Sequence, residues 1–180
     1  VTSDLATDNR ILRHCELIHQ MGFKVHLIGR IHPWSPAMPV LPYPVHRVKL
    51  PFLKGPLFYL SYQCWLFFYL LFRKADIIWA NDLDTVVPSY IISKLRGLDY
   101  IVDSHELFTE VPELSKAPIK KSIWKFIEKH LAVKANIFIT VNQSLAKIFH
   151  EKYGINPKVV RNVPKRVDIP PAHSRNQIGI

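Results

Sequence analysis

The chain has 180 residues, 48% of them hydrophobic, and its 24 Lys and Arg against 14 Asp and Glu give a formal net charge of +10. This length and composition allow one domain with a sizeable buried core. The positive charge favours nucleic acid, anionic lipid or phosphorylated small molecules without choosing among them. Two cysteines, Cys15 and Cys64, argue against a disulfide framework or a Cys-based zinc site and predict a reducing, cytoplasmic setting.

The sequence opens with Val1 and shows neither an initiator Met nor a basic start followed by an apolar run. We therefore expect no cleavable secretion signal at this end. We also expect the complete protein to contain residues upstream of Val1.

A helix is predicted near the start of the chain, where Asp8 is placed to cap its first turn and Gly22 to end it. β-Rich runs at residues 23–28, ending at Gly29, and at residues 46–50 predict two strands. The segment between them contains five prolines and excludes regular structure. The apolar positions of the helix recur at helical spacing: Ile11, Leu12, Cys15, Ile18 and Met21.

The most hydrophobic stretch covers residues 57–72 and is followed directly by Arg73 and Lys74. It is shorter than the roughly 20 apolar residues of a membrane span and contains Gln63. We predict a helix buried against a sheet. A helix with a membrane-facing side and a true span are the alternatives.

Strand-like and helix-like segments alternate through the remainder of the domain. Strands are predicted at residues 76–80, 100–104, 137–141 and 158–161, and helices at 85–97, 118–134 and 144–153. This alternation predicts an α/β, Rossmann-like parallel sheet with helices on both faces, formed by residues 1–164. Residues 165–180 are predicted to be a linker or tail. One face of the helix at 118–134 is predicted to be buried through Ile119, Ile123, Ile127 and Leu131.

Polar loops follow the predicted strands, at residues 3–10, 81–84, 103–106, 142–144 and 161–164. In an open parallel sheet, ligands bind at the carboxyl ends of the strands, where the strand order reverses. These five loops are therefore the candidate site.

Asp82 and Asp84 form a D-x-D pattern, which some sugar transferases use to hold a metal against a nucleotide diphosphate. Helix capping by Asp82 or Asp84 is the favoured interpretation. Metal binding and contact with a sugar hydroxyl are the alternatives.

His105 and Glu106 do not form a zinc-protease motif, because the second histidine of H-E-x-x-H is missing. The histidine could orient an acceptor hydroxyl or relay its proton, since imidazole titrates near neutral pH. Alternatively, Asp103 and His105 only stabilise their own loop. No nucleophile elbow of the G-x-S-x-G form is present.

Neither of the common glycine-rich phosphate loops occurs. The loop at residues 3–10 could still approach a diphosphate near a helix N-terminus, although a solvated or structural role is the default for Arg10. Lys and Arg are scattered and no nucleic-acid recognition motif is apparent, so nucleic acid is not predicted as a partner.

Taken together, these segments resemble the N-terminal domain of the bacterial glycosyltransferases of the group 1 (family 4) type, which have the two-domain GT-B fold. The resemblance extends over nearly the whole chain to about Pro164. It is carried by residues 7–10, 22–30, 80–85, 103–110, 140–142 and 161–164.

This resemblance implies retaining transfer from a nucleotide sugar, without a metal or other cofactor, onto a saccharide or lipid-linked acceptor in cell-surface polysaccharide synthesis. It places His105 near the reacting sugar as the catalytic residue. The acceptor side is implied to contain Asn81, Asp82, Asp84, Glu106 and Glu110. The donor side is implied to contain Arg10, Asn142 and Asn162.

Two departures from the family pattern affect these expectations. The glycine-rich turn after the family's first strand is replaced here by residues 3–6, and most of that strand precedes Val1. The family's C-terminal donor domain, with its pair of glutamates, has no counterpart within the 180 residues. We therefore expect the isolated chain to be inactive.

The sequence thus predicts the acceptor-side half of a glycosyltransferase that works in the cytoplasm. A basic, apolar surface suits peripheral contact with the inner face of the cell membrane. The main alternative is a non-catalytic sugar- or partner-binding module derived from such an enzyme.

Overall fold

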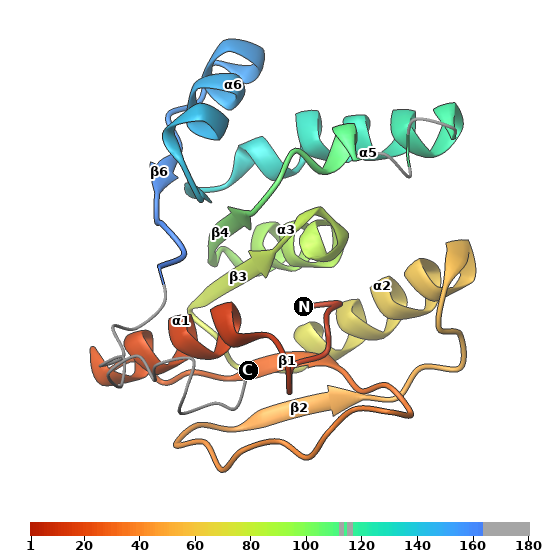
Figure 1. The fold of residues 1–180 in the computed structure, drawn as a ribbon, viewed down its shortest axis with the longest axis vertical. Coiled ribbons are helices and arrows are strands. Elements are labelled where there is room, and N and C mark those ends of the chain that lie inside the picture. Colours follow the sequence, from red (N-terminus) through yellow and green to blue (C-terminus); the bar gives the residue numbers. More distant parts are fainter. Residues whose placement is uncertain (112–113, 115–116, 164–180) are drawn as a thin grey trace, which may run out of the picture.

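The computed structural model describes residues 1–111, 114 and 117–163 (Figure 1). The predicted linker at residues 165–180 and Pro164 of the last polar loop lie outside this part of the chain.

All the strand pairs are parallel, as predicted. One sheet pairs β1 with β2, and the other has the order β3-β4-β5-β6. The strands are β1 (Leu27–Arg30), β2 (Val45–Val48), β3 (Ile77–Asn81), β4 (Asp99–Ser104), β5 (Ile137–Thr140) and β6 (Lys158–Val159).

Residues 1–4 lie between the two sheets. The Val1 amino group donates to Ile28 O at 2.8 Å and Asp4 forms a bridge with Arg30, both on the edge of β1 away from β2. On its other side, Thr2 donates to Asp84, which follows β3. From residues 1–4, the chain adds β1 and β2 on one side and β3 to β6 on the other. The strand order therefore reverses at this segment.

Helices cover both faces of the strands. Apolar residues of α2 and α3 pack with Ile28, Val48 and Ile78 on one face, and α1 brings His14 against Trp79 on the other (Figure 1). The predicted α/β, Rossmann-like class is confirmed. The helices are α1 (Asn9–Gln20), α2 (Gly55–Leu71), α3 (Val86–Arg96), α5 (Pro118–His130) and α6 (Gln143–Tyr153).

Local sequence signals set several helix ends. The Asp8 carboxylate accepts from Ile11 N at 3.1 Å and caps α1, as predicted, and Asn142 caps α6 in the same way. Gly154 ends α6 with φ 69°, a left-handed conformation that favours glycine.

Helix α2 is buried along one stripe, as predicted for this stretch. Phe58, Tyr62, Leu66 and Leu70 recur every four residues and are at most 8% exposed. The opposite face contains exposed residues such as Leu60. None of the helices in the described ranges is long and apolar enough to cross a membrane.

The prediction for Gly29 as the end of a strand was wrong. β1 begins only at Leu27, because Phe23 N bonds back to Ile18 O and keeps the start of the predicted run at the end of α1. The strand then continues through Gly29 to Arg30. A Cβ on Gly29 would lie only 2.6–2.9 Å from side-chain atoms of Leu5. Glycine is needed here because Leu5 packs directly on the strand.

The predicted apolar face of α5 was also wrong in part. Ile127 and Leu131 pack on the core, but Ile119 is 78% and Ile123 54% exposed. Trp124 takes their place, because the helix is rotated so that its Trp124 edge faces the core. The α-helix ends at His130, and a 3-10 turn, η3 (Ala132–Lys134), completes the predicted range.

We expect Gly29→Ala to lower the free energy of unfolding by about 1–3 kcal/mol, because the added methyl group overpacks Leu5. Urea denaturation measures this change. Leu5→Ala in the same chain should make Gly29→Ala much less costly. If the two changes are additive, the clash with Leu5 is not the cause.

Candidate functional site

The loops after β3 and β4 lie side by side at the carboxyl edge of the sheet. Asn81 is in register with Asp103, and Asp82 N donates to Asp103 O at 2.9 Å. The strand pairing thus brings together two of the five predicted loops, at the point where the strand order reverses.

The Asp103 carboxylate, which is fully buried at the end of β4, is the centre of this site. It accepts from Arg10 Nη2 at 2.9 and 3.2 Å. His105 Nε2 lies 3.2 Å and His14 Nδ1 3.5 Å from the same carboxylate, at ion-pair distance but without hydrogen-bond alignment. Helix α1 supplies Arg10 and His14 one turn apart, so a single helix face closes over Asp103.

Electrostatics favour the charged forms of this cluster. Burial disfavours an ionised Asp103, but His105, His14 and Arg10 outweigh it and hold the pKa of Asp103 far below its usual range. Burial likewise opposes protonation of His105, but the carboxylates of Asp103 and Asp82 raise its pKa to about 9. At neutral pH, His105 is therefore an imidazolium held between two carboxylates.

Asp82 holds the other side of His105. Its Oδ2 lies 3.3 Å from His105 Nδ1, and its Oδ1 accepts from His105 N at 3.3 Å. Its backbone has φ 58° and ψ 166°, which is strained for a residue other than glycine. Strain of this kind persists only where the surroundings impose it, and here it aims the carboxylate at His105.

Asp84 points into the protein. Its buried side chain accepts from the Thr2 hydroxyl, and its carbonyl accepts from Gln63 Nε2 of α2 at 2.7 Å. Burial is the main cause that raises the pKa of Asp84 to about 6.

The prediction that Asp82 or Asp84 caps the following helix was wrong. A 3-10 turn, η1 (Leu83–Thr85), separates Asp82 from α3, and no side chain caps either element. The Asp82 side chain bonds His105, and that of Asp84 bonds Thr2, so both have other partners.

The predicted residues on the outer part of the edge lie apart from this cluster. Glu106 is exposed, and Glu110 pairs with Lys121 of α5 at 2.5 Å. Asn142 caps α6, and Asn162 accepts from Arg13 of α1 at 2.6 Å.

A second buried polar network supports the loop that follows His105. Glu128 of α5, 2% exposed, accepts from Lys152 Nζ of α6 at 2.8 Å and from the Tyr153 hydroxyl. Thr109, in the 3-10 turn η2 (Phe108–Glu110), lies 3.5 Å from both Glu128 Oε2 and Lys152 Nζ. The loop, α5 and α6 are therefore joined through one carboxylate.

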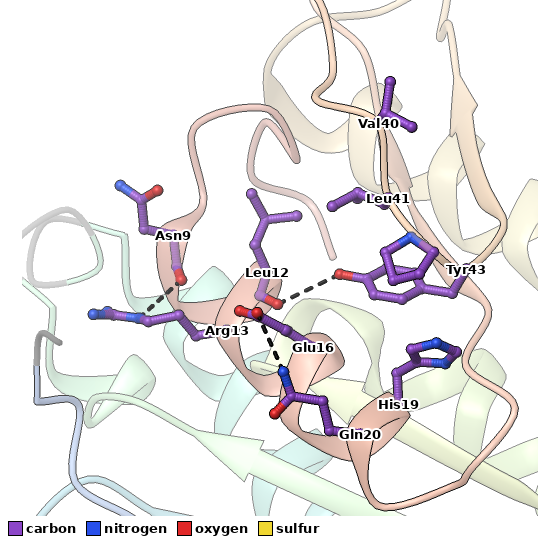
Figure 2. A pocket seen from close by; sticks show the side chains of 10 residues that line it. Asn9, Leu12, Arg13, Glu16, His19, Gln20, Val40, Leu41 and Tyr43 are labelled. Atoms are coloured by element: carbon purple, nitrogen blue, oxygen red, sulfur yellow. Dashed lines mark hydrogen bonds between the residues drawn. The ribbon is translucent and has the colours of Figure 1, made fainter.

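A surface pocket of about 680 Å³ lies between α1 and the proline-rich segment (Figure 2). Leu12 and Glu16 of α1 face Leu41 and Tyr43 across it, and none of the predicted site residues lines it. Figure 2 shows that Gln20 donates to Glu16, the Tyr43 hydroxyl to Leu12 O and Arg13 to Asn9 O. The candidate site remains at the strand ends.

Metal ligation was the alternative use of the D-x-D pattern. Within the described ranges, no group of three His, Cys, Asp or Glu side chains is placed to hold a metal ion. Cys15 and Cys64 are free thiols.

Comparison with protein families agrees with this geometry. The sequence model described as Glycosyltransferase Family 4 matches residues 8–169. This range includes the whole Asp103 cluster, which consists of Arg10, His14, Asp82, Asp103 and His105. The chain belongs to this family. A search of curated proteins finds no match. Membership of the glycosyltransferase family supports a transferase domain and implies binding of a sugar donor and an acceptor in general.

In this family 4 domain, sequence reasoning missed His14 and Thr2. The spacing of Arg10 and His14 was the available signal, because residues four apart share a helix face. Nothing local indicated Thr2, whose contact with Asp84 joins residues 82 positions apart.

We expect Asp103→Asn to lower the free energy of unfolding by about 3–5 kcal/mol, because it leaves the buried Arg10 guanidinium without its counter-ion. Urea denaturation measures the change. Asp99→Asn, an exposed position on the same strand, is the control and should change stability by no more than about 0.5 kcal/mol. Equal effects at the two positions would contradict the role of the Arg10–Asp103 pair.

We expect His105 to titrate near pH 9 in an NMR experiment that follows the imidazole signals, whereas His26 should titrate below 6.5 because burial lowers its pKa. The pairing of His105 stabilises the fold fully below its ordinary pKa of about 6.5, and this contribution is lost as the pH rises through about 9. His105→Gln should therefore destabilise the fold more at pH 6 than at pH 10. A His105 pKa near 6.5 would contradict the pairing.

Proposed function

We propose that this domain is the acceptor-side half of a GT-B enzyme that transfers a sugar, with retention, from a nucleotide-sugar donor to a saccharide or lipid-linked acceptor. The observation that carries the proposal is the cluster around Asp103, placed at the carboxyl edge where the strand order reverses. A cluster of fixed charges in this position suits the binding and orientation of a polar substrate.

His105 is the proposed catalytic residue. Its pKa of about 9 favours a fixed cation over a group that relays a proton at neutral pH. Such a cation would stabilise negative charge that develops on a sugar oxygen beside it. The carboxylates of Asp82 and Asp103 hold the ring in place for this role.

On the acceptor side, Asp82 is the proposed group for a sugar hydroxyl, because its side chain is 34% exposed beside His105. Asn81, Glu106 and Glu110 are proposed to complete this side through the two adjacent loops, and the buried Asp84 to support the first of these loops through its bond with Thr2.

On the donor side, the proposed residues are Arg10, in the first turn of α1, and Asn142 and Asn162, which follow β5 and β6. Nε and Nη1 of Arg10 are buried without a hydrogen-bond partner among the described residues. The diphosphate oxygens of a nucleotide sugar could accept from them. No metal or other cofactor is part of the proposal.

The proposed complete enzyme adds a second, donor-binding domain and acts in cell-surface polysaccharide synthesis at the inner face of the cell membrane. A non-catalytic sugar- or partner-binding module is the alternative. The full gene distinguishes them, because the enzyme requires a second α/β domain with donor-binding glutamates after Ile180.

We expect His105→Ala in the complete enzyme to lower turnover by about 100- to 1,000-fold, as loss of a preorganised electrostatic group does. The measurement is release of UDP or GDP from a panel of UDP-glucose, UDP-galactose, UDP-N-acetylglucosamine and GDP-mannose.

His150→Gln is the matched control, because His150 is exposed on α6 and its Nδ1 lies 3.0 Å from Ile155 O. It should keep the turnover of the unmodified enzyme. Circular dichroism should show that both variants are folded. A folded His105→Ala enzyme with full turnover would remove His105 from the mechanism.

A further inference from the structure

Two exposed segments lie at the same carboxyl edge as the Asp103 cluster. The first, residues 51–57, follows β2 and leads into α2, and all seven residues are exposed. The second is the first part of α5, which follows the loop after β4. Figure 1 shows the first turns of α2 and α5 on the same side of the molecule.

Aromatic contacts join the two segments. The Tyr59 ring, in the second turn of α2, meets the Trp124 ring of α5 with centroids 5.3 Å apart. Trp124 also contacts Phe108, in the loop that follows His105, at 5.0 Å. One continuous surface is therefore formed by the first turns of α2, the first turns of α5 and the loop that follows His105, which we call the His105 loop.

This surface, which we call the apolar rim, exposes large apolar side chains. On α5, Ile119, Ile123 and Phe126 lie at helical spacing on one face and are between 54% and 78% exposed. Exposed apolar groups on this scale indicate an interaction surface. The apolar rim consists of Phe52, Leu57, Leu60, Ile119, Ile123 and Phe126.

The charge around the apolar rim has one sign. Residues 49–60 and 117–130 together contain six lysines and one acidic residue, Glu128. Glu128 is buried and paired with Lys152, so it does not neutralise the surface. Glu110 partly balances the charge of Lys121 and Lys125. Positive charge at the margins of the apolar rim comes from Lys49, Lys54, Lys120 and Lys129.

We propose that the apolar rim is a docking surface for an anionic lipid bilayer. Apolar side chains enter the boundary between headgroups and acyl chains, and the surrounding lysines pair with lipid phosphates. This combination favours a bilayer over a nucleic acid, because phosphates alone would not account for the exposed Ile119, Ile123 and Leu57 side chains.

Docking in this orientation turns the carboxyl edge of the sheet toward the membrane. The His105 loop contacts the apolar rim through Phe108 and Trp124, so a lipid-linked acceptor could reach His105 without leaving the bilayer surface. This consequence rests on the proposed function, whereas the docking itself does not.

The test is co-sedimentation of the protein with vesicles of phosphatidylcholine alone or mixed with phosphatidylglycerol, at low salt. We expect binding to the mixed vesicles and a loss of at least about ten-fold in affinity for Lys120→Gln/Lys129→Gln, since each lysine near an anionic surface contributes about five-fold. Ile119→Ser/Ile123→Ser should lose binding to a similar degree.

Matched controls come from the opposite edge of the sheet, which also exposes apolar and basic side chains. Phe72→Ser/Leu95→Ser and Lys24→Gln/Lys74→Gln remove groups of the same kind there and should leave binding unchanged. Circular dichroism checks that each variant is folded.

The proposal is overturned if the unmodified protein does not bind the mixed vesicles, or if it binds pure phosphatidylcholine equally well. It is also overturned if only the opposite-edge variants lose binding, or if the Ile119→Ser/Ile123→Ser change alters self-association in light scattering instead. Vesicle binding requires no sugar transfer, so its outcome is independent of the proposed activity.

Discussion

The buried ion pair between Arg10 and Asp103 is the constraint on which the site depends. A carboxylate with no exposed surface needs a partner inside the protein, and α1 supplies the guanidinium from the opposite side of the strand-order reversal. The same pair holds α1 against β4 and gives His105 Nε2 a negative partner. One interaction thus fixes a helix position, a loop and the charge of the candidate catalytic group.

Contacts on either side of this pair connect the two sheets. Thr2 reaches Asp84 after β3, while the Tyr62 hydroxyl of α2 donates to Val1 O at 2.9 Å. Residues 1–4 therefore contact a strand, a loop and a helix that are distant in sequence. Beyond the cluster, Glu128 joins α5, α6 and the His105 loop, so the carboxyl edge is supported from both halves of the fold.

The order of elements and the parallel sheet could be predicted from the sequence, because periodicity, caps and glycines are local signals. Asp8, Asn142 and Gly154 act at the positions and in the roles that local chemistry assigns them. Features that depend on distant packing could not be predicted in this way. Glycine is needed at residue 29 because Leu5 packs on β1, and the exposure of Ile119 depends on a rotation of α5 that turns Trp124 toward the core. Within the candidate site, the loops were predictable from the strand ends, but the contact of His105 with both Asp82 and Asp103 arises only in three dimensions.

The backbone of Asp82 restricts which amino acids can occupy this position. Glycine would relieve the strain at φ 58° but would remove the partner of His105 Nδ1, and alanine would keep the strain without providing a partner. Asparagine would keep the strain and an oxygen, but it carries no negative charge. Of these four residues only aspartate provides the negative charge beside His105, so variation that preserves the site should be far narrower here than at Glu106, an exposed position on the neighbouring loop.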